Sequence, residues 1–127
     1  MFNKEFEQKI IEISKLQNIV AIILFGSYAK GTQKPNYDYD IAVIVKNNNK
    51  KTIAILESMK TNKFDIISFN KIPLYVKYEV FKFGKILFVN DNKQFEKETY
   101  TTMLEVQDNY HHYTTLVNYR DNYGLQS

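Results

Sequence analysis

Two aspartates separated by one residue, Asp38 and Asp40, stand at the start of an apolar run, Tyr39–Val45. Alternate side chains of a β-strand lie on the same face, so these two carboxylates are expected roughly 7 Å apart along the backbone on one side of a sheet. Carboxylates that converge repel each other unless a positive charge lies between them. Mg²⁺ held by carboxylates and substrate phosphates is a common solution, so the pair is a candidate metal site.

A Gly-Ser pair, Gly26 and Ser27, ends the preceding apolar run and is followed by ten residues before Asp38. A glycine lets the backbone come close to a phosphate, and a serine offers a hydroxyl and N–H groups where a helix can begin. Two aspartates at a strand start are, in isolation, more often solvated than functional. The order of apolar run, Gly-Ser, polar loop with Gly31, paired aspartates and second apolar run favours a site.

This arrangement resembles the signature GSx10DxD of the minimal nucleotidyltransferases of the polymerase-beta-like superfamily. The residues that match are Gly26, Ser27, Asp38 and Asp40. The resemblance implies an α/β (α+β) fold of the polymerase-beta type, with helices packed on a mixed, mostly antiparallel sheet and a C-terminal helical segment. It also implies a third carboxylate on the strand beside the aspartate pair, and Asp65 is the match by position; the alternative is a solvated carboxylate at a strand start.

The chemistry implied by this resemblance is nucleotidyl transfer, with ATP as co-substrate and two Mg²⁺ ions as cofactors. Asp38 and Asp40 would hold Mg²⁺ against the triphosphate, and Asp65 would bind a second metal or take the proton of the attacking hydroxyl. The nucleotide phosphates would be bound by Gly26, Ser27 and Lys30. Lys30 stands where the family often carries a basic residue, although it could equally be a solvated loop lysine.

The short length of the chain suggests which molecule accepts the nucleotide, since the chain has a nucleotidyltransferase core and little else. It is similar to the antitoxins of type VII-like HEPN/MNT toxin–antitoxin pairs, which implies transfer of AMP to a tyrosine of a HEPN-domain ribonuclease toxin as partner. The alternatives are an aminoglycoside-type nucleotidyltransferase, disfavoured by the missing acceptor domain, and a binding-only antitoxin, disfavoured by the three carboxylates. A homodimer and a hetero-oligomer with the toxin both stay open.

Composition limits the remaining classes. The 127 residues predict a single domain over residues 1–127, with a core of about 1–90 and a helical segment of about 92–123. The absence of cysteine excludes disulfides and thiolate metal sites. A net charge of +3 with Arg120 as the only arginine argues against direct nucleic-acid recognition. No apolar run approaches the roughly 20 residues that span a bilayer, so we expect a cytoplasmic protein without a membrane partner.

Hydrophobic periodicity predicts the elements that position the candidate site. Strands are expected at 19–25, 39–45, 64–69 and 86–89, and helices at 3–16, 50–60, 73–83 and 92–123, with a helical turn at 27–31. This order would bring the candidate residues to one edge of the sheet. The last segment carries a stripe that could be core or a partner surface: Met103, Val106, Tyr110, Tyr113 and Val117.

Overall fold

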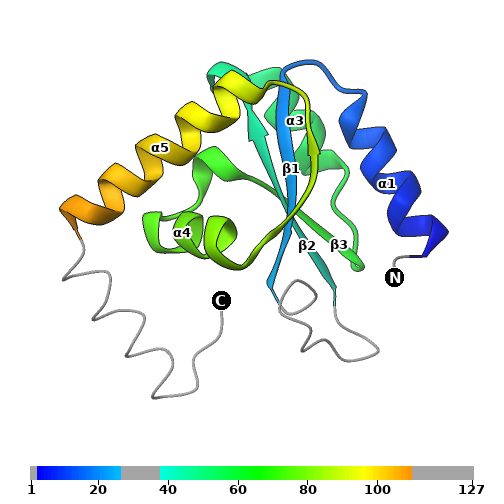
Figure 1. The fold of residues 1–127 in the computed structure, drawn as a ribbon. Coiled ribbons are helices and arrows are strands. Elements are labelled where there is room, and N and C mark those ends of the chain that lie inside the picture. The colour runs from blue at the N-terminus through cyan, green and yellow to red at the C-terminus, as the bar shows by residue number, and fades with distance from the viewer. Residues whose placement is uncertain (1–2, 27–37, 110–127) are drawn as a thin grey trace.

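A four-stranded sheet with helices on both faces forms the centre of the molecule (Figure 1). The computed structural model describes residues 3–26 and 38–109. Its helices and strands are α1 (Lys4–Ser14), β1 (Ile19–Phe25), β2 (Tyr39–Val45), α3 (Lys50–Ser58), β3 (Phe64–Ser68), α4 (Leu74–Phe83), β4 (Lys85–Val89) and α5 (Asn92–Asp108), with short 3-10 turns η1 (Lys46–Asn48) and η2 (Phe69–Lys71). The predicted strands and helices are therefore found in the described part of the chain, with ends that differ by a few residues, whereas the predicted helical turn at 27–31 lies outside the described residues.

The strands lie in the order β3-β2-β1-β4. β1 is antiparallel to both β2 and β4, whereas β2 and β3 are parallel. Parallel neighbours need a crossover connection, and α3 supplies it between β2 and β3. The prediction of a mixed, mostly antiparallel sheet is confirmed.

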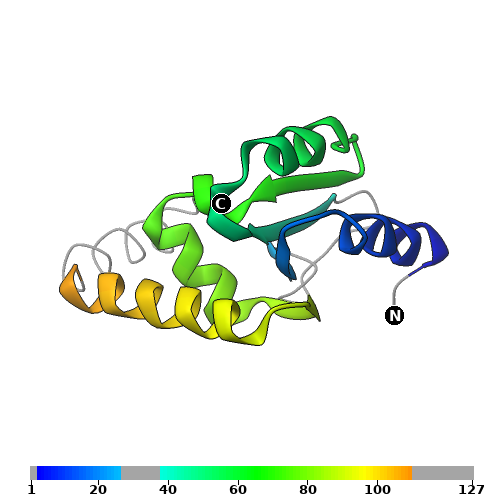
Figure 2. The ribbon, with the colours of Figure 1, turned by 90° about the horizontal axis from the view of Figure 1, so that it is seen from above.

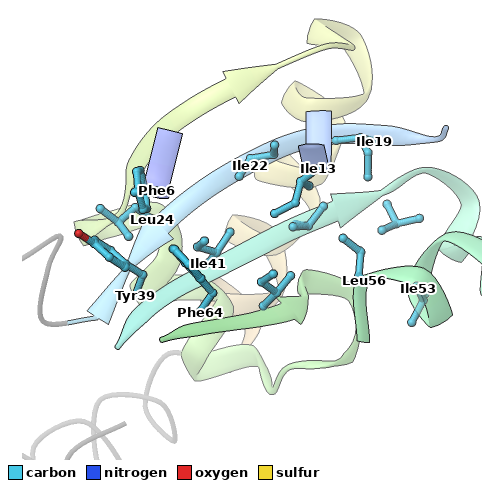
Figure 3. Packing of buried hydrophobic residues seen from close by; sticks show 13 residues of the cluster. Phe6, Ile13, Ile19, Ile22, Leu24, Tyr39, Ile41, Ile53, Leu56 and Phe64 are labelled. Atoms are coloured by element: carbon cyan, nitrogen blue, oxygen red, sulfur yellow. The ribbon is translucent and has the colours of Figure 1, made fainter. Parts of the chain in front are cut away.

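Each face of the sheet has its own hydrophobic core. β1 and β2 are buried along almost their whole length, which explains why both read as unbroken apolar runs. One face packs against α1 and α3 through the buried side chains Phe6, Ile13, Ile53 and Leu56 (Figure 3). The other face packs against α4 and α5, which lie together below the sheet in Figure 2, through Val80, Val76, Phe81 and Phe95.

The helix ends follow local capping chemistry. The Asn3 side chain caps α1 by accepting a hydrogen bond of 2.8 Å from the Phe6 N–H. Asn49 and Asp91 cap α3 and α5 in the same way. Gly84 follows the last turn of α4, and a Cβ there would collide with the Val80 carbonyl and lie 2.7 Å from Ile23 Cγ2. This glycine lets the helix end close against β1.

The described part of the C-terminal helical segment packs on the chain's own core. Val106 is buried and Met103 is half-buried, while Phe95 makes an edge contact with Phe81 of α4, their ring centroids 6.0 Å apart. The predicted helix beyond residue 109, with Tyr110, Tyr113 and Val117 of the stripe, lies outside the described residues. Across residues 3–26 and 38–109, none of the helices combines the length and apolar character that crossing a bilayer requires.

The contact between α1 and the sheet gives a prediction about stability. Phe6 is 2% exposed and Ile11 on the same helix is 45% exposed. Phe6→Ala is expected to lower the free energy of unfolding by about 3–4 kcal/mol because it leaves a cavity in the core. Ile11→Ala, the matched control, should change it by less than about 1 kcal/mol. Urea denaturation measures both, and equal losses would contradict the placement of Phe6.

Candidate active site

Parallel pairing of β2 with β3 brings two of the predicted carboxylates side by side. The register pairs Tyr39 with Phe64 and Asp40 with Asp65. Residues that are partners in a parallel pair point to the same face, so both carboxylates lie on the side of the sheet that carries α4. Asp38 is exposed and precedes β2 by one residue, and its charge is close enough to act on Asp40. The structure thus brings Asp38, Asp40 and Asp65 to one edge.

Three aromatic rings secure the same edge from the opposite face. The Tyr39 and Phe64 rings stack with their centroids 5.4 Å apart and an angle of 13° between their planes. The ring centroid of Phe6 in α1 lies 4.5 Å from that of Tyr39 (Figure 3). Tyr39 and Phe64 are almost fully buried. The Tyr39 N–H also donates a 2.8 Å hydrogen bond to the Lys63 carbonyl, just before β3. These contacts fix the strand register that pairs the carboxylates.

Gly26 approaches Asp40 so closely that no larger residue fits. It follows β1, where Phe25 is the register partner of Asp40, and its φ of +74° is in the left-handed region. A Cβ at this position would collide with Oδ2 of Asp40 and lie 3.1 Å from its Cγ. The glycine of the sequence signature therefore has a steric role beside the carboxylate.

Asp40 is the carboxylate most affected by its surroundings. Partial burial, followed by the negative charges of Asp65 and Asp38, raises the pKa of Asp40 from its ordinary 3.8 to about 6. Among the described residues, no basic side chain forms an ion pair with Asp40. A cation bound here would relieve both the burial cost and the repulsion.

Asp65 differs because Lys60, just beyond α3, forms an ion pair with it at 3.5 Å between Nζ and Oδ1. Sequence reasoning missed Lys60, since a lysine after a helix carries no motif signal. Within residues 3–26 and 38–109, no three acidic or histidine side chains already form a cluster suited to a metal ion. Of the predicted phosphate-binding residues, Gly26 is described, whereas Ser27 and Lys30 lie outside the described residues.

Two curated relatives resemble part of the chain. The match to "Putative protein adenylyltransferase MJ1547" of Methanocaldococcus jannaschii is 34% identical over 73 residues, which is 58% of this chain and 58% of that protein. The match to "Protein adenylyltransferase MntA" of Aphanizomenon flos-aquae is 25% identical over 100 residues, or 67% of each chain. The aligned part thus spans less than two thirds of the archaeal protein's length.

Solved structures share the fold over most of the chain. A toxin-antitoxin structure with AMP-PNP has a TM-score of 0.63 and 25% identity, covering 88% of this chain and 95% of that chain. A structure of a tri-AMPylated Shewanella oneidensis HEPN toxin in complex with MNT antitoxin has a TM-score of 0.57 and 22% identity, covering 88% of this chain and 92% of that chain.

The family model described as polymerase beta nucleotidyltransferase matches residues 8–93, which include β1 to β4 and all three carboxylates. This match confirms the family expected from the Gly-Ser and paired-aspartate spacing. The chain belongs to the polymerase beta nucleotidyltransferase family.

Proposed function

We propose that this protein is an antitoxin that transfers AMP from ATP to a tyrosine of a HEPN-domain ribonuclease toxin and thereby neutralises it. The observation that carries the catalytic part is the pairing of Asp40 with Asp65 on one face, with Asp38 beside them and Gly26 against Asp40. The acceptor is supported by similarity to two proteins named as protein adenylyltransferases and to a toxin-antitoxin structure with AMP-PNP.

The proposed reaction is an in-line displacement at the α-phosphorus of ATP. The tyrosine Oη attacks this phosphorus, a new P–O bond forms, and the bond to the leaving diphosphate breaks. The proton of the attacking hydroxyl goes to Asp65, which lies on β3 beside the other two carboxylates. Ser27 and Lys30 are proposed to bind the phosphates, with Gly26 allowing the close approach of the backbone.

The donor set suits Mg²⁺. Carboxylates supply the hard oxygen ligands that this ion prefers, and Mg²⁺ usually takes its other ligands from phosphates and water. That preference agrees with the absence of a ready three-residue cluster in the described part of the chain, since two carboxylates suffice when a nucleotide is present. We propose that Asp38 and Asp40 hold one ion with the triphosphate, and that a second is bound only with the nucleotide. When bound, Mg²⁺ neutralises charge on the phosphates and the leaving diphosphate.

The first prediction tests the acceptor and the aspartate pair together. The purified protein, mixed with the cognate HEPN toxin, ATP and Mg²⁺, should add one or more AMP units to the toxin, read by mass spectrometry. Asp38→Asn combined with Asp40→Asn should lower the rate by at least about 100-fold because the metal ligands are lost. The matched control is Glu96→Gln on an exposed turn of α5, which should leave the rate unchanged.

Two results would contradict this proposal. Toxin that is neutralised equally well by the double variant, with no added mass, would indicate a binding-only antitoxin. Transfer of AMP to an aminoglycoside and not to the toxin would indicate a small-molecule nucleotidyltransferase.

Asp65 should separate turnover from nucleotide binding. Asp65→Asn is expected to reduce the rate of transfer strongly while changing the affinity for Mg²⁺-ATP less than about threefold, because its role belongs to the attacking hydroxyl. Calorimetric titration with a non-hydrolysable ATP analogue measures the affinity. If nucleotide binding falls as steeply as turnover, Asp65 is a ligand of the nucleotide-bound metal instead.

Asp40 should also make the metal-free protein less stable as the pH rises. Because its pKa is about 6 in the folded protein and about 4 in the unfolded chain, the folded state binds more protons between these values. Stability therefore falls as the pH rises through this window, and the full penalty is present above pH 6. Asp40 is partly exposed, so we expect a penalty of about 1 kcal/mol after solvent screening.

This penalty is measured by comparing denaturation curves of the natural protein and Asp40→Asn in metal-free buffer. The free energy of unfolding of Asp40→Asn, relative to that of the natural protein, should rise by about 1 kcal/mol between pH 4.5 and pH 7. The other titrating groups are common to both proteins and cancel in this difference. Parallel pH profiles would show that the carboxylate is not destabilised by its neighbours.

A further inference from the structure

Lys60 places a fixed positive charge on one side of the carboxylate group. Its Nζ lies 3.5 Å from Oδ1 of Asp65, which is the register partner of Asp40. Lys60 follows α3, the helix that joins the two carboxylate-bearing strands. The crossover that makes β2 and β3 parallel therefore also delivers this ammonium group to the site.

Among the described residues, Lys60 forms its ion pair with Asp65, and its charge also acts on Glu57. Glu57 on the last turn of α3 is bound by Lys71, with 2.8 Å between Nζ and Oε1. Glu5 is bound by Lys63 at 3.2 Å. Both members of the Lys60–Asp65 pair are about half exposed, and such pairs contribute little to folding stability. The main effect of Lys60 is therefore on the charge of the site.

The result is an asymmetric group of carboxylates. Asp65 has an ammonium counter-charge, whereas neither Asp38 nor Asp40 pairs with a basic side chain among the described residues. A divalent cation bound by Asp65 would lie close to the Lys60 ammonium group and would be repelled by it. A cation is therefore attracted more strongly to Asp38 and Asp40 than to Asp65.

We propose that Lys60 is a positioning residue that keeps Asp65 from binding a divalent cation in the nucleotide-free protein, which therefore binds one such ion, at Asp38 and Asp40. The inference rests on the proposed function because it concerns the same carboxylates. It assigns different partners to them before ATP arrives: Asp38 and Asp40 are open to a metal ion, and Asp65 is paired with Lys60.

The test is a titration of the nucleotide-free protein with Mn²⁺, with free ion followed by electron paramagnetic resonance. The natural protein should bind one ion per chain. Lys60→Ala should bind Mn²⁺ about five- to tenfold more tightly or gain a second ion, because a nearby positive charge is removed. The difference should shrink at 0.5 M salt, since the group is exposed to screening.

Two control variants separate charge from structure. Lys60→Arg keeps the charge and should bind Mn²⁺ like the natural protein. Lys63→Ala removes a lysine of similar exposure that pairs with Glu5, and should also leave Mn²⁺ binding unchanged. A lysine that merely supports the end of α3 would lower the melting temperature in Lys60→Ala and leave metal affinity unaltered.

Unchanged or weaker Mn²⁺ binding by Lys60→Ala would overturn the proposal, as would two equivalent ions in the natural protein. Asp38→Asn combined with Asp40→Asn distinguishes this failure from a failure of the proposed site. If binding is lost in that double variant while Lys60→Ala behaves like the natural protein, only the role of Lys60 is wrong. If the natural protein binds no Mn²⁺, or the double variant still binds it, the metal site itself is misplaced.

Discussion

The register between β2 and β3 is the constraint on which the site depends. Side chains alternate along a strand, so a one-residue shift of β3 against β2 would move Asp65 to the face opposite Asp40. Tyr39 and Phe64 prevent that shift because their stacked rings are buried beneath Phe6. The same pairing that buries two aromatic rings on one face sets Asp40 beside Asp65 on the other. The pairing of β2 with β3 therefore determines both the aromatic packing on one face of the sheet and the position of the carboxylates on the other.

The two faces act in opposite directions on stability. The aromatic face removes large apolar side chains from water, which stabilises the fold. The carboxylate face brings negative charges together in a partly buried position, and the raised pKa of Asp40 reports the resulting cost. A site of this kind is tolerated because the core beneath it is extensive: β1 and β2 are buried from almost one end to the other.

The sequence predicted the fold well because its strongest signals are local. Unbroken apolar runs predicted β1 and β2, and the spacing of apolar residues predicted the helices. The resemblance to the nucleotidyltransferases predicted Asp65, which matches by position the third carboxylate of that family. Its pairing with Asp40 requires the parallel crossover, which no local pattern specifies.

Other features of the site could not be read from the sequence. Lys60 reaches Asp65 only because α3 ends beside the start of β3, and an isolated lysine after a helix has no distinguishing pattern. The apolar stripe of the last helix was ambiguous for a related reason: periodicity identifies an apolar face and not what covers it. In the described part, Val106 lies in the chain's own core.

The close approach of Gly26 to Asp40 restricts the order in which this site can change during evolution. While the aspartate is present, even one added methyl group at position 26 collides with its carboxylate. Replacement of Asp40 by alanine would remove the carboxylate from this contact but leave the Cβ of residue 40 at 3.3 Å, together with the cost of a positive φ, about 1–2 kcal/mol for most residues and less for asparagine. Descendants in which this site is lost are therefore expected to replace the aspartate first. In such lineages, a surviving glycine beside a missing aspartate would mark a recent loss of activity.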